Sequence, residues 1–292
     1  MPELNRGIDH LVLCARDLAR ARKRYRALGF TTTPPALHPF GTGNSLVQLQ
    51  GNFLELIAVV EPENIAPREA GEFGFGGHVR HFLGRREGMA MLVFESQDAV
   101  ADQAEFAAKK GVETYAPLHF QRQAKQPDGS SVTVAFSLAF ATSPALPEAV
   151  FFTCQQHAPQ YFWKPEYQTH ANGARMVAEV VMVAPSPGDL AGFLGQLQTP
   201  GAVRLDGGTL RMTTARGDLR VVTPDHFERR FGTPPPGSAS PHFAAYRIVV
   251  DAIEETMAVL DGNAMAYRRI EDCVIVDADS GLGVVIAFSE ME

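Results

Sequence analysis

The strongest constraint on the fold is a strand–helix–strands order that occurs four times along the 292 residues. In the first unit an apolar strand begins at Ile8, and a helix with one apolar stripe runs from Asp17, an acceptable N-cap, to Gly29, a typical helix-ending residue. Three strand candidates follow, at 30–33, 45–50 and 53–60. This order predicts a βαβββ module.

The same order returns three times. Strands beginning at Met89, Met176 and Phe243 are each followed by a helical pattern. The later strand candidates are 132–141 and 149–155, then 209–214 and 219–223, and finally 273–277 and 284–288. Superposing the strand-to-helix junctions aligns His10, Met91, Glu179 and Ala244. One module cannot cover both faces of its small sheet, so the modules must pair. We predict an α+β protein of four βαβββ modules paired into two domains with curved mixed sheets.

The domain limits follow from the repeat and from the residues between modules. We expect a first domain over residues 1–160, a connector over 161–173 and a second domain over 174–292. The connector contains the Pro and Gly residues typical of such a segment.

Composition narrows the class of partner. The net charge of −7 and the sequence pI near 5.7, with basic residues scattered among acids, argue against nucleic acid. No apolar run approaches the ~18 residues of a membrane span, and the polar start does not resemble a signal peptide. Cys14, Cys154 and Cys273 lie too far apart to suggest a disulfide framework. We expect a cytoplasmic protein with a small-molecule partner; a homodimer is compatible with the sequence.

Several segments resemble a known superfamily. Ile8-Asp9-His10-Leu11-Val12-Leu13, with the helix that ends at Leu28-Gly29-Phe30, resembles the opening module of vicinal-oxygen-chelate proteins (the glyoxalase, bleomycin resistance and extradiol dioxygenase group). His38-Pro39-Phe40-Gly41-Thr42-Gly43-Asn44 and Phe53-Leu54-Glu55-Leu56-Ile57 resemble its glyoxalase-like domain proteins. The resemblance is specific for fold and does not fix a reaction.

The resemblance also implies a metal site, because ligands in this superfamily come from the first and last strand of each module. His10 and Glu55 occupy those positions in the first module. In the second module Met91 departs from the pattern, and strand alternation puts Gln155 and His157 on one face, where either can supply the missing donor. We predict His10, Glu55 and His157 as ligands, with Glu55 also as the catalytic base.

Substrate contacts are expected from Asn44 and His170, which lie in the matching motifs, and from Gln155. Each candidate also has a plainer interpretation. His10 can be a hydrogen-bonded core residue, Glu55 can pair with an arginine, and His157 can face solvent. Asn44 can shape a turn after Gly43. Gly74–Gly77 is expected to be a flexible connector between modules, and His78–His81 a polar helix lining that connection. His119 can reach the cleft, and Tyr161–Trp163 can wall an apolar pocket or simply pack the connector against a domain.

Two imidazoles and a carboxylate suit divalent Fe, Mn, Ni or Zn and leave positions for a bidentate substrate. We therefore predict a metal-dependent lyase, isomerase or dioxygenase acting on a small oxygenated metabolite by bidentate chelation. The alternative is a non-catalytic protein of the resistance type that binds or sequesters a small molecule. A third option moves the site to the last two modules, where Glu179 stands at the first-strand position.

Overall fold

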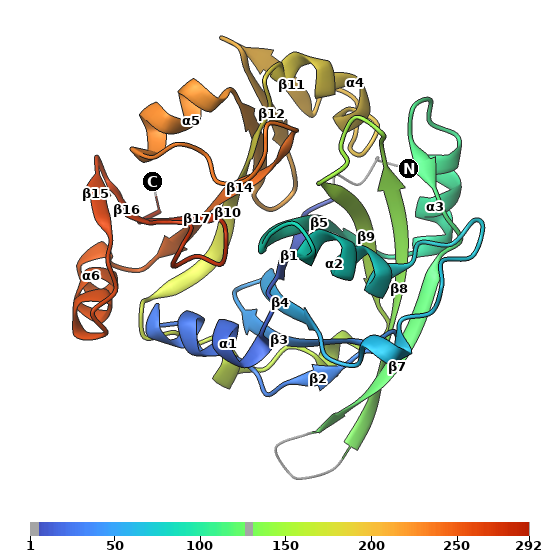
Figure 1. Cartoon of the computed structure of the whole chain (residues 1–292), viewed down its shortest axis with the longest axis horizontal. Helices are drawn as coiled ribbons and strands as arrows, with labels where there is room; N and C mark the ends of the chain where they lie inside the picture. The colour runs from blue at the N-terminus through green and yellow to red at the C-terminus, as the bar shows by residue number, and fades with distance from the viewer. Residues whose placement is uncertain (1–5, 126–130, 292) are drawn as a thin grey trace.

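The first two modules form a single nine-stranded sheet in the computed structural model, which describes residues 6–125 and 131–291 (Figure 1). The strand order is β2-β3-β4-β1-β5-β9-β8-β6, with β7 paired to β8. The first module contains β1 (Ile8–Cys14), α1 (Leu18–Ala27), β2 (Ala36–Leu37), β3 (Thr42–Gln48) and β4 (Phe53–Val59). The second contains β5 (Gly88–Ser96), α3 (Ala99–Ala107), β6 (Glu113–Thr114), β7 (Leu118–Lys125), β8 (Ser131–Thr142) and β9 (Val150–Gln156).

The last two modules form an eight-stranded sheet in the order β11-β12-β13-β10-β14-β17-β16-β15. The third module contains β10 (Ala174–Val183), α4 (Ala191–Leu194), β11 (Val203–Asp206), β12 (Thr209–Thr213) and β13 (Asp218–Val222). The fourth contains β14 (His242–Val250), α6 (Ile253–Gly262), β15 (Arg268–Ile270), β16 (Cys273–Val276) and β17 (Val285–Ser289). The predicted α+β class with paired modules and curved mixed sheets is confirmed.

Additional helices link the modules. Helix α2 (Phe75–Leu83) joins the first module to the second, and α5 (Pro224–Phe231) joins the third to the fourth. Short 3-10 turns lie at η1 (Pro62–Asn64), η2 (Pro159–Tyr161), η3 (Pro165–Tyr167) and η4 (Pro187–Leu190). No helix in the described residues is long and apolar enough to cross a membrane.

Local chemistry sets the limits of α1 as the sequence predicts. The Asp17 carboxylate accepts a hydrogen bond from the Arg20 backbone N–H, which otherwise has no partner within the helix. Gly29 follows the helix with a φ of +90°, a conformation that residues with a Cβ rarely adopt. Between these ends Ala21 and Tyr25 are buried on the apolar stripe.

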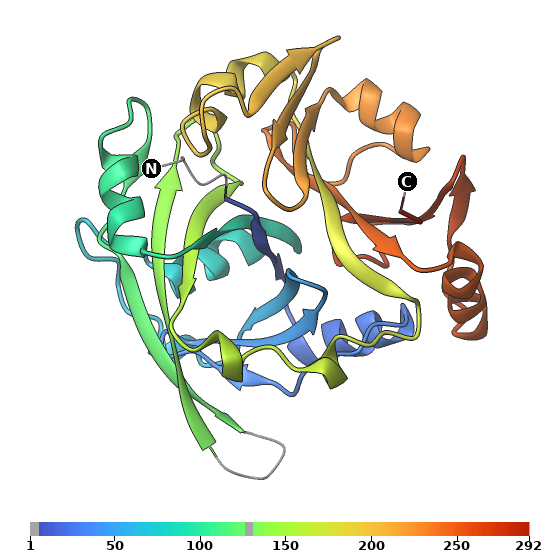
Figure 2. The ribbon, with the colours of Figure 1, turned by 180° about the vertical axis from the view of Figure 1, so that it is seen from behind.

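The two sheets lie side by side in the ribbon (Figure 2). One face of each contributes to a single core shared by both halves of the chain. Phe151 on β9 meets Phe243 on β14 edge to face, with ring centroids 5.5 Å apart. The hydroxyl groups of Tyr25 on α1 and Tyr246 on β14 lie 2.8 Å apart, also across the two halves. Because this core joins the sheets, a small-molecule site has to lie on their other faces.

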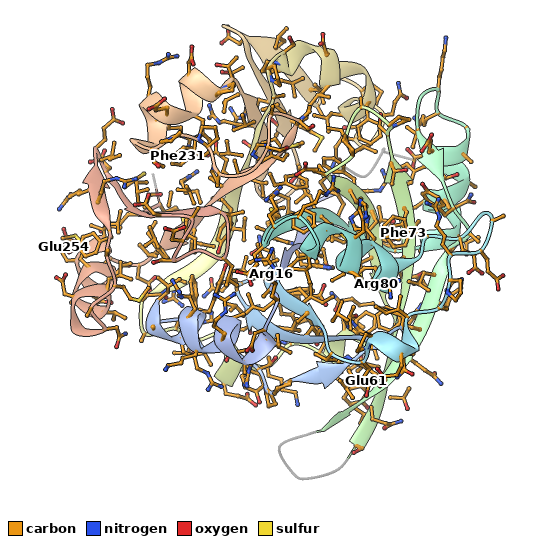
Figure 3. All side chains as sticks on the ribbon, in the orientation of Figure 1. Arg16, Glu61, Phe73, Arg80, Phe231 and Glu254 are labelled. Atoms are coloured by element: carbon orange, nitrogen blue, oxygen red, sulfur yellow. The ribbon has the colours of Figure 1, made fainter. Side chains whose placement is uncertain are left out.

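The other face of the first sheet packs beneath α2. Phe75, Val79 and Phe82 of this helix join an apolar cluster with Val12 and Phe152 of the sheet. Phe73, labelled in Figure 3, precedes the helix and packs against the same cluster. This arrangement leaves a hollow between the helix side and the strands.

Three local expectations are wrong. Residues 30–33 are not a strand; the paired segment is β2, beyond Pro34 and Pro35, which lack the N–H groups that a ladder needs. Gly74–Gly77 is not a flexible connector, because α2 begins at Phe75. The helix expected after the strand that begins at Met176 is reduced to η4 and the short α4.

Candidate functional site

The cleft on the α2-covered face of the first sheet holds the candidate site. It encloses about 450 Å³ of empty space including its mouth. Seven phenylalanines dominate its wall, and the polar lining comes from a few side chains that face one another. The apolar residues are Phe40, Leu46, Phe53, Phe75, Phe120, Phe136, Leu138, Phe152 and Phe162, and the polar ones are His10, His38, Asn44, Glu55, Arg122 and Cys154. An apolar pocket with a few convergent polar groups is typical of a small-molecule site.

His10 and Glu55 lie side by side in this cleft. The parallel pairing of β1 with β4 puts His10 opposite Phe53 and Val12 opposite Glu55, so both polar side chains share one face. His10 Nε2 lies 3.8 Å from Glu55 Oε2, beyond hydrogen-bond distance. The imidazole stacks on the Phe53 ring at 4.3 Å. Both side chains are buried.

A bulge in β1 orients His10. Ile8 pairs with Phe94 and His10 with Val93, so Asp9 is an extra residue in β1 against β5. Its carboxylate therefore turns toward the cleft side, where Asp9 Oδ2 lies 2.6 Å from His10 Nδ1. A carboxylate at Nδ1 favours a proton on that nitrogen and leaves the Nε2 lone pair free toward Glu55.

His38 is the third polar group here, and the sequence analysis did not assign it as a ligand. His38 Nε2 lies 3.7 Å from Glu55 Oε1, and its Nδ1 is 2.9 Å from Thr42 Oγ1. Burial lowers the pKa of His38 to about 4, so the ring is neutral at pH 7. The sequence feature that could have identified His38 as a site residue is its place in the His38–Asn44 motif.

Asn44 lies inside the cleft rather than in a turn. It is within β3, where its Nδ2 donates to Glu55 Oε1 at 2.7 Å and lies 3.2 Å from His38 Nε2. The amide thus fixes the carboxylate between the two imidazoles.

Arg122 brings positive charge to the cleft mouth. On β7 the side chains of Phe120 and Arg122 both point into the cleft, whereas His119 between them points to the other face of the sheet. The same guanidinium borders a second hollow outside the cleft, lined also by Tyr161, Phe162 and Tyr167. Within the described residues it makes no hydrogen bond or ion pair, and burial lowers its pKa while the Glu55 charge raises it.

Cys154 is the sulfur group of the cleft. Burial raises the pKa of its thiol well above the usual value, and the charges of Asp9 and Glu55 add to this. The thiol is therefore not a nucleophile at neutral pH.

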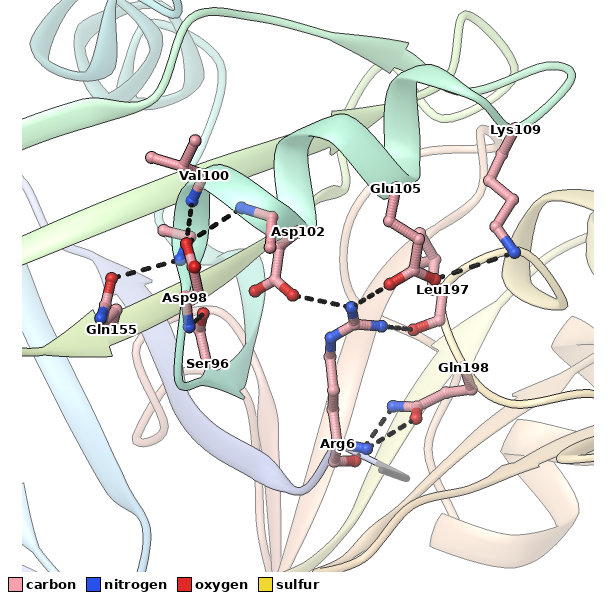
Figure 4. Close-up of polar contacts among 12 residues, drawn as sticks. Arg6, Ser96, Asp98, Val100, Asp102, Glu105, Lys109, Gln155, Leu197 and Gln198 are labelled. Carbon is pink, nitrogen blue, oxygen red and sulfur yellow. Dashed lines mark hydrogen bonds and ion pairs between the residues drawn. The ribbon is translucent and has the colours of Figure 1, made fainter. Parts of the chain in front are cut away.

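Gln155 and His157 are not brought together with His10 and Glu55. On β9 the cleft-facing positions are Phe152 and Cys154, so Gln155 lies on the opposite face, where its Oε1 accepts from Ala99 N at the start of α3 (Figure 4). His157 Nε2 instead lies 2.6 Å from Ser137 Oγ, next to His119. Strand alternation was predicted correctly for these residues, but the face that turns toward the cleft was not.

His170 also lies outside the cleft. Its Nδ1 accepts from Thr31 N at 3.0 Å, and its Nε2 lies 2.9 Å from the Gln48 carbonyl oxygen. These bonds tie the connector to the first module. Of the connector aromatics, Phe162 does line the cleft.

The strand registers identify the second-module counterparts of the two candidate ligands. Val12 pairs with Met91 and His10 with Val93, so the local two-fold relation maps His10 onto Met91. Val93 pairs in parallel with Phe152 as Val12 does with Glu55, so Glu55 maps onto Phe152. The second module therefore places apolar side chains at both positions.

The chemistry of the remaining donors fits a divalent metal. His10 and His38 offer imidazole nitrogens, and Glu55 a carboxylate, which is the two-histidine, one-carboxylate set of many first-row metal sites. As the side chains stand, residues 6–125 and 131–291 contain no group of three His, Cys, Asp or Glu arranged tightly enough to hold an ion. The donor types fit, and closing the set needs movement of these side chains.

Paired βαβββ modules with a cleft on one face of a curved sheet define a glyoxalase-like architecture of the vicinal-oxygen-chelate superfamily. The chain belongs to the glyoxalase-like domain family, whose profile matches residues 8–198. No functionally curated protein matches the sequence.

Solved structures share the fold at 11% sequence identity. A hypothetical protein from Staphylococcus aureus has a TM-score of 0.67, covering 98% of this chain and 100% of its own. A fusion of a xylose isomerase-like TIM barrel with 4-hydroxyphenylpyruvate dioxygenase has a TM-score of 0.57, covering 98% of this chain and 48% of its own. A mutant 4-hydroxymandelate synthase from Streptomyces coelicolor has a TM-score of 0.56, covering 99% of this chain and 94% of its own.

Proposed function

We propose that the first cleft is the active site of a metal-dependent lyase, isomerase or dioxygenase that acts on a small oxygenated metabolite. The observation that carries this proposal is the convergence of His10 Nε2 and His38 Nε2 on the two oxygens of the buried Glu55 carboxylate, at 3.8 and 3.7 Å. His10, His38 and Glu55 would hold the metal; His38 takes the place that the sequence analysis gave to His157.

The side chains of the cleft have separate tasks in this proposal. Asp9 at His10 Nδ1 favours the tautomer with its proton on that nitrogen and so directs Nε2 toward Glu55, and the low pKa of His38 keeps that ring neutral at pH 7. Glu55, steadied by Asn44, accepts a proton from carbon or oxygen of the substrate. A divalent metal bound there supplies a Lewis acid for two neighbouring substrate oxygens.

The cleft wall favours a particular substrate class. The phenylalanines accept an aromatic or branched apolar body, because they exclude water and offer ring faces and edges. Arg122 at the mouth suits a carboxylate or another oxyanion at one end of the molecule. We expect an apolar acid with adjacent oxygens.

Metal content of purified variants tests the donor set. We expect the wild-type protein, prepared without chelator, to bind about one divalent ion per chain, and His10→Ala, His38→Ala and Glu55→Gln each to lose most of it. His157→Ala is the matched control, because its imidazole lies on the other face. The proposal fails if the three cleft variants retain the metal, or if His157→Ala alone loses it.

A second candidate is a non-catalytic binding protein. Met91 and Phe152 favour it, because they remove the second module's share of the ligand set. Incubating metal-loaded protein with a ligand found by thermal-shift screening separates the two. Recovery of the unchanged ligand supports binding alone, whereas turnover supports the enzyme.

A further inference from the structure

The second sheet carries a hollow of its own, independent of the first cleft. It opens on the face of β10, β13, β14 and β17 beside α5, with about 1490 Å³ of empty space open to solvent. Phe231 on α5 and Glu254 at the start of α6, both labelled in Figure 3, line it. Glu179, Arg220, Arg230, Arg247 and Ser289 supply its inner polar groups.

Strand registers relate this hollow to the first cleft position by position. Val181 pairs with Arg220 as Val12 pairs with Glu55, and Glu179 pairs with Arg247 as His10 pairs with Val93. Glu179 therefore replaces His10, and Arg220 replaces Glu55. A guanidinium thus occupies the place of the carboxylate, and the charge at the centre of the hollow is reversed.

The inner part of the hollow places three arginines (Arg220, Arg230 and Arg247) around one carboxylate, Glu179, whereas Arg269 and the other acidic residues of the lining lie at its rim. Glu179, with a side chain only 4% exposed, is approached by Arg220 Nε and Arg230 Nη2, each 2.5 Å from a different oxygen. Arg220 Nε lies at ion-pair distance from Glu179 without the alignment of a hydrogen bond, so this contact is electrostatic only. Two arginines therefore share this carboxylate, and Arg247 lies in the same hollow without an acidic partner among the described residues.

Arg247 is the arginine with spare binding capacity. Its Nη1 donates to Ser289 Oγ at 2.9 Å, and in the described part of the chain it forms no ion pair. The acidic residues at the rim, Glu254, Glu271, Asp272 and Glu290, are exposed, and within the described residues none of them forms an ion pair with Arg247; Glu290 accepts from the Ile253 N–H.

We propose that this hollow binds the oxyanionic group, carboxylate or phosphate, of a small metabolite, held by Arg247 with Arg220 and Arg230. Guanidinium groups match two oxygens of such a group at once and bind it with charge-assisted hydrogen bonds. A cation would be repelled by the same three arginines, so this hollow, unlike the first cleft, does not suit a metal ion. Glu179 occupies two of the arginines and acts as an internal competitor.

Titration with inorganic phosphate and with malonate, each against chloride at equal ionic strength, tests the site by calorimetry. We expect binding of at least one of them, weakened about tenfold or more by Arg247→Gln, which removes a charge-assisted contact. Glu179→Gln should act in the opposite direction and tighten binding, because it frees two guanidinium groups. The control is Arg211→Gln on β12, whose guanidinium is paired with Asp218 outside the hollow.

Which of the two anions binds indicates the chemical class of the natural ligand. Binding of phosphate alone points to a phosphorylated ligand, and binding of malonate alone to a carboxylic acid; either supports the proposal. The proposal is overturned if neither anion binds better than chloride, or if Arg247→Gln and Glu179→Gln leave the affinities unchanged. Because Arg247 and Glu179 lie outside the first cleft, a change in affinity on their substitution reports on this hollow and not on the proposed active site.

Discussion

Asp9 illustrates how one residue determines the chemistry of its neighbours. In a regular strand, consecutive side chains point to opposite faces, and Asp9 would lie away from His10. The bulge turns it to the same side, so that its carboxylate meets His10 Nδ1 and also accepts from Gln156 Nε2 at 3.1 Å. The one-residue bulge therefore gives the buried His10 ring a carboxylate partner that fixes its orientation.

Two buried histidines make the free energy of unfolding depend on pH in the acidic range. Burial lowers the pKa of both His38 and His78 from 6.5 to about 4. Between pH 4 and pH 6.5 the unfolded chain binds protons that the folded protein does not, so the free energy of unfolding rises with pH over this range. Above pH 6.5 both histidines are neutral in either state, and they cause no further pH dependence. Each contributes at most about 1.4 kcal/mol per pH unit.

His78→Leu isolates one of the two groups. Its Nε2 is buried without a hydrogen-bond partner, so the substitution removes a titrating group and no polar contact. Urea unfolding at pH 5, 6 and 7 should give a shallower pH dependence for the variant than for wild type. Equal slopes would show that His78 titrates normally in the folded protein.

Among the elements, α2 closes the first cleft, and two adjacent glycines at its start have different surroundings. A Cβ on Gly76 would lie 2.2 Å from the Phe40 carbonyl oxygen, whereas one on Gly77 would find its nearest neighbour, Ile65 Cγ2, at 4.0 Å. Gly76 therefore permits the close approach of α2 to the loop before β3, which carries the cleft residue Phe40.

Gly76→Ala and Gly77→Ala should change stability in opposite directions. We expect Gly77→Ala to stabilise by up to about 1 kcal/mol through helix propensity. Gly76→Ala should destabilise by about 1–3 kcal/mol, because the obstacle is backbone that cannot rotate away. Thermal unfolding of the two variants provides the comparison, and shifts of the same sign would contradict the packing of α2.

At the scale of the whole molecule, we predict that the two sheets unfold as one unit, because side-chain contacts join them. Asn52, in the turn before β4, bonds to both backbone groups of Val177 on β10: Nδ2 donates to the carbonyl and Oδ1 accepts from the N–H, each at 3.0 Å. Arg6 adds contacts from the chain start to Asp102 and Glu105 of α3 and to Gln198 in the other half (Figure 4). Together with the shared core, these contacts couple the halves.

Asn52→Ala tests this coupling. It leaves two buried backbone groups of Val177 without partners, and we expect a loss of about 2–4 kcal/mol. Asn64→Ala is the control, because that amide bonds only to the side chain of Glu61 at the surface. Calorimetry should record a single transition for all three proteins. Two separate transitions, or equal stability of both variants, would contradict a single unit.

Much of the fold and part of the site followed from local pattern. Strand-to-helix junctions such as the one at Asp17 depend on capping and apolar periodicity, which are properties of neighbouring residues. His10 and Glu55 could be placed because they lie on strands whose order the repeat specifies, and Asn44 because it lies in a motif that resembles the glyoxalase-like domain proteins. His38 could not, because its position depends on how the loop before β3 folds back over β4. Arg122 likewise depends on β7, a strand absent from the expected pattern.

The sequence by itself determined the architecture: repeated alternation and helical stripes specify each module, and a module that cannot bury its own sheet has to pair. Only the tertiary structure decided which sheet face became the cleft, and hence that Gln155 and His157 lie outside it. The physical reason is that strand alternation assigns side chains to two faces but does not say which face is the cleft. That depends on what packs against each face, here α2 on one side and the second sheet on the other.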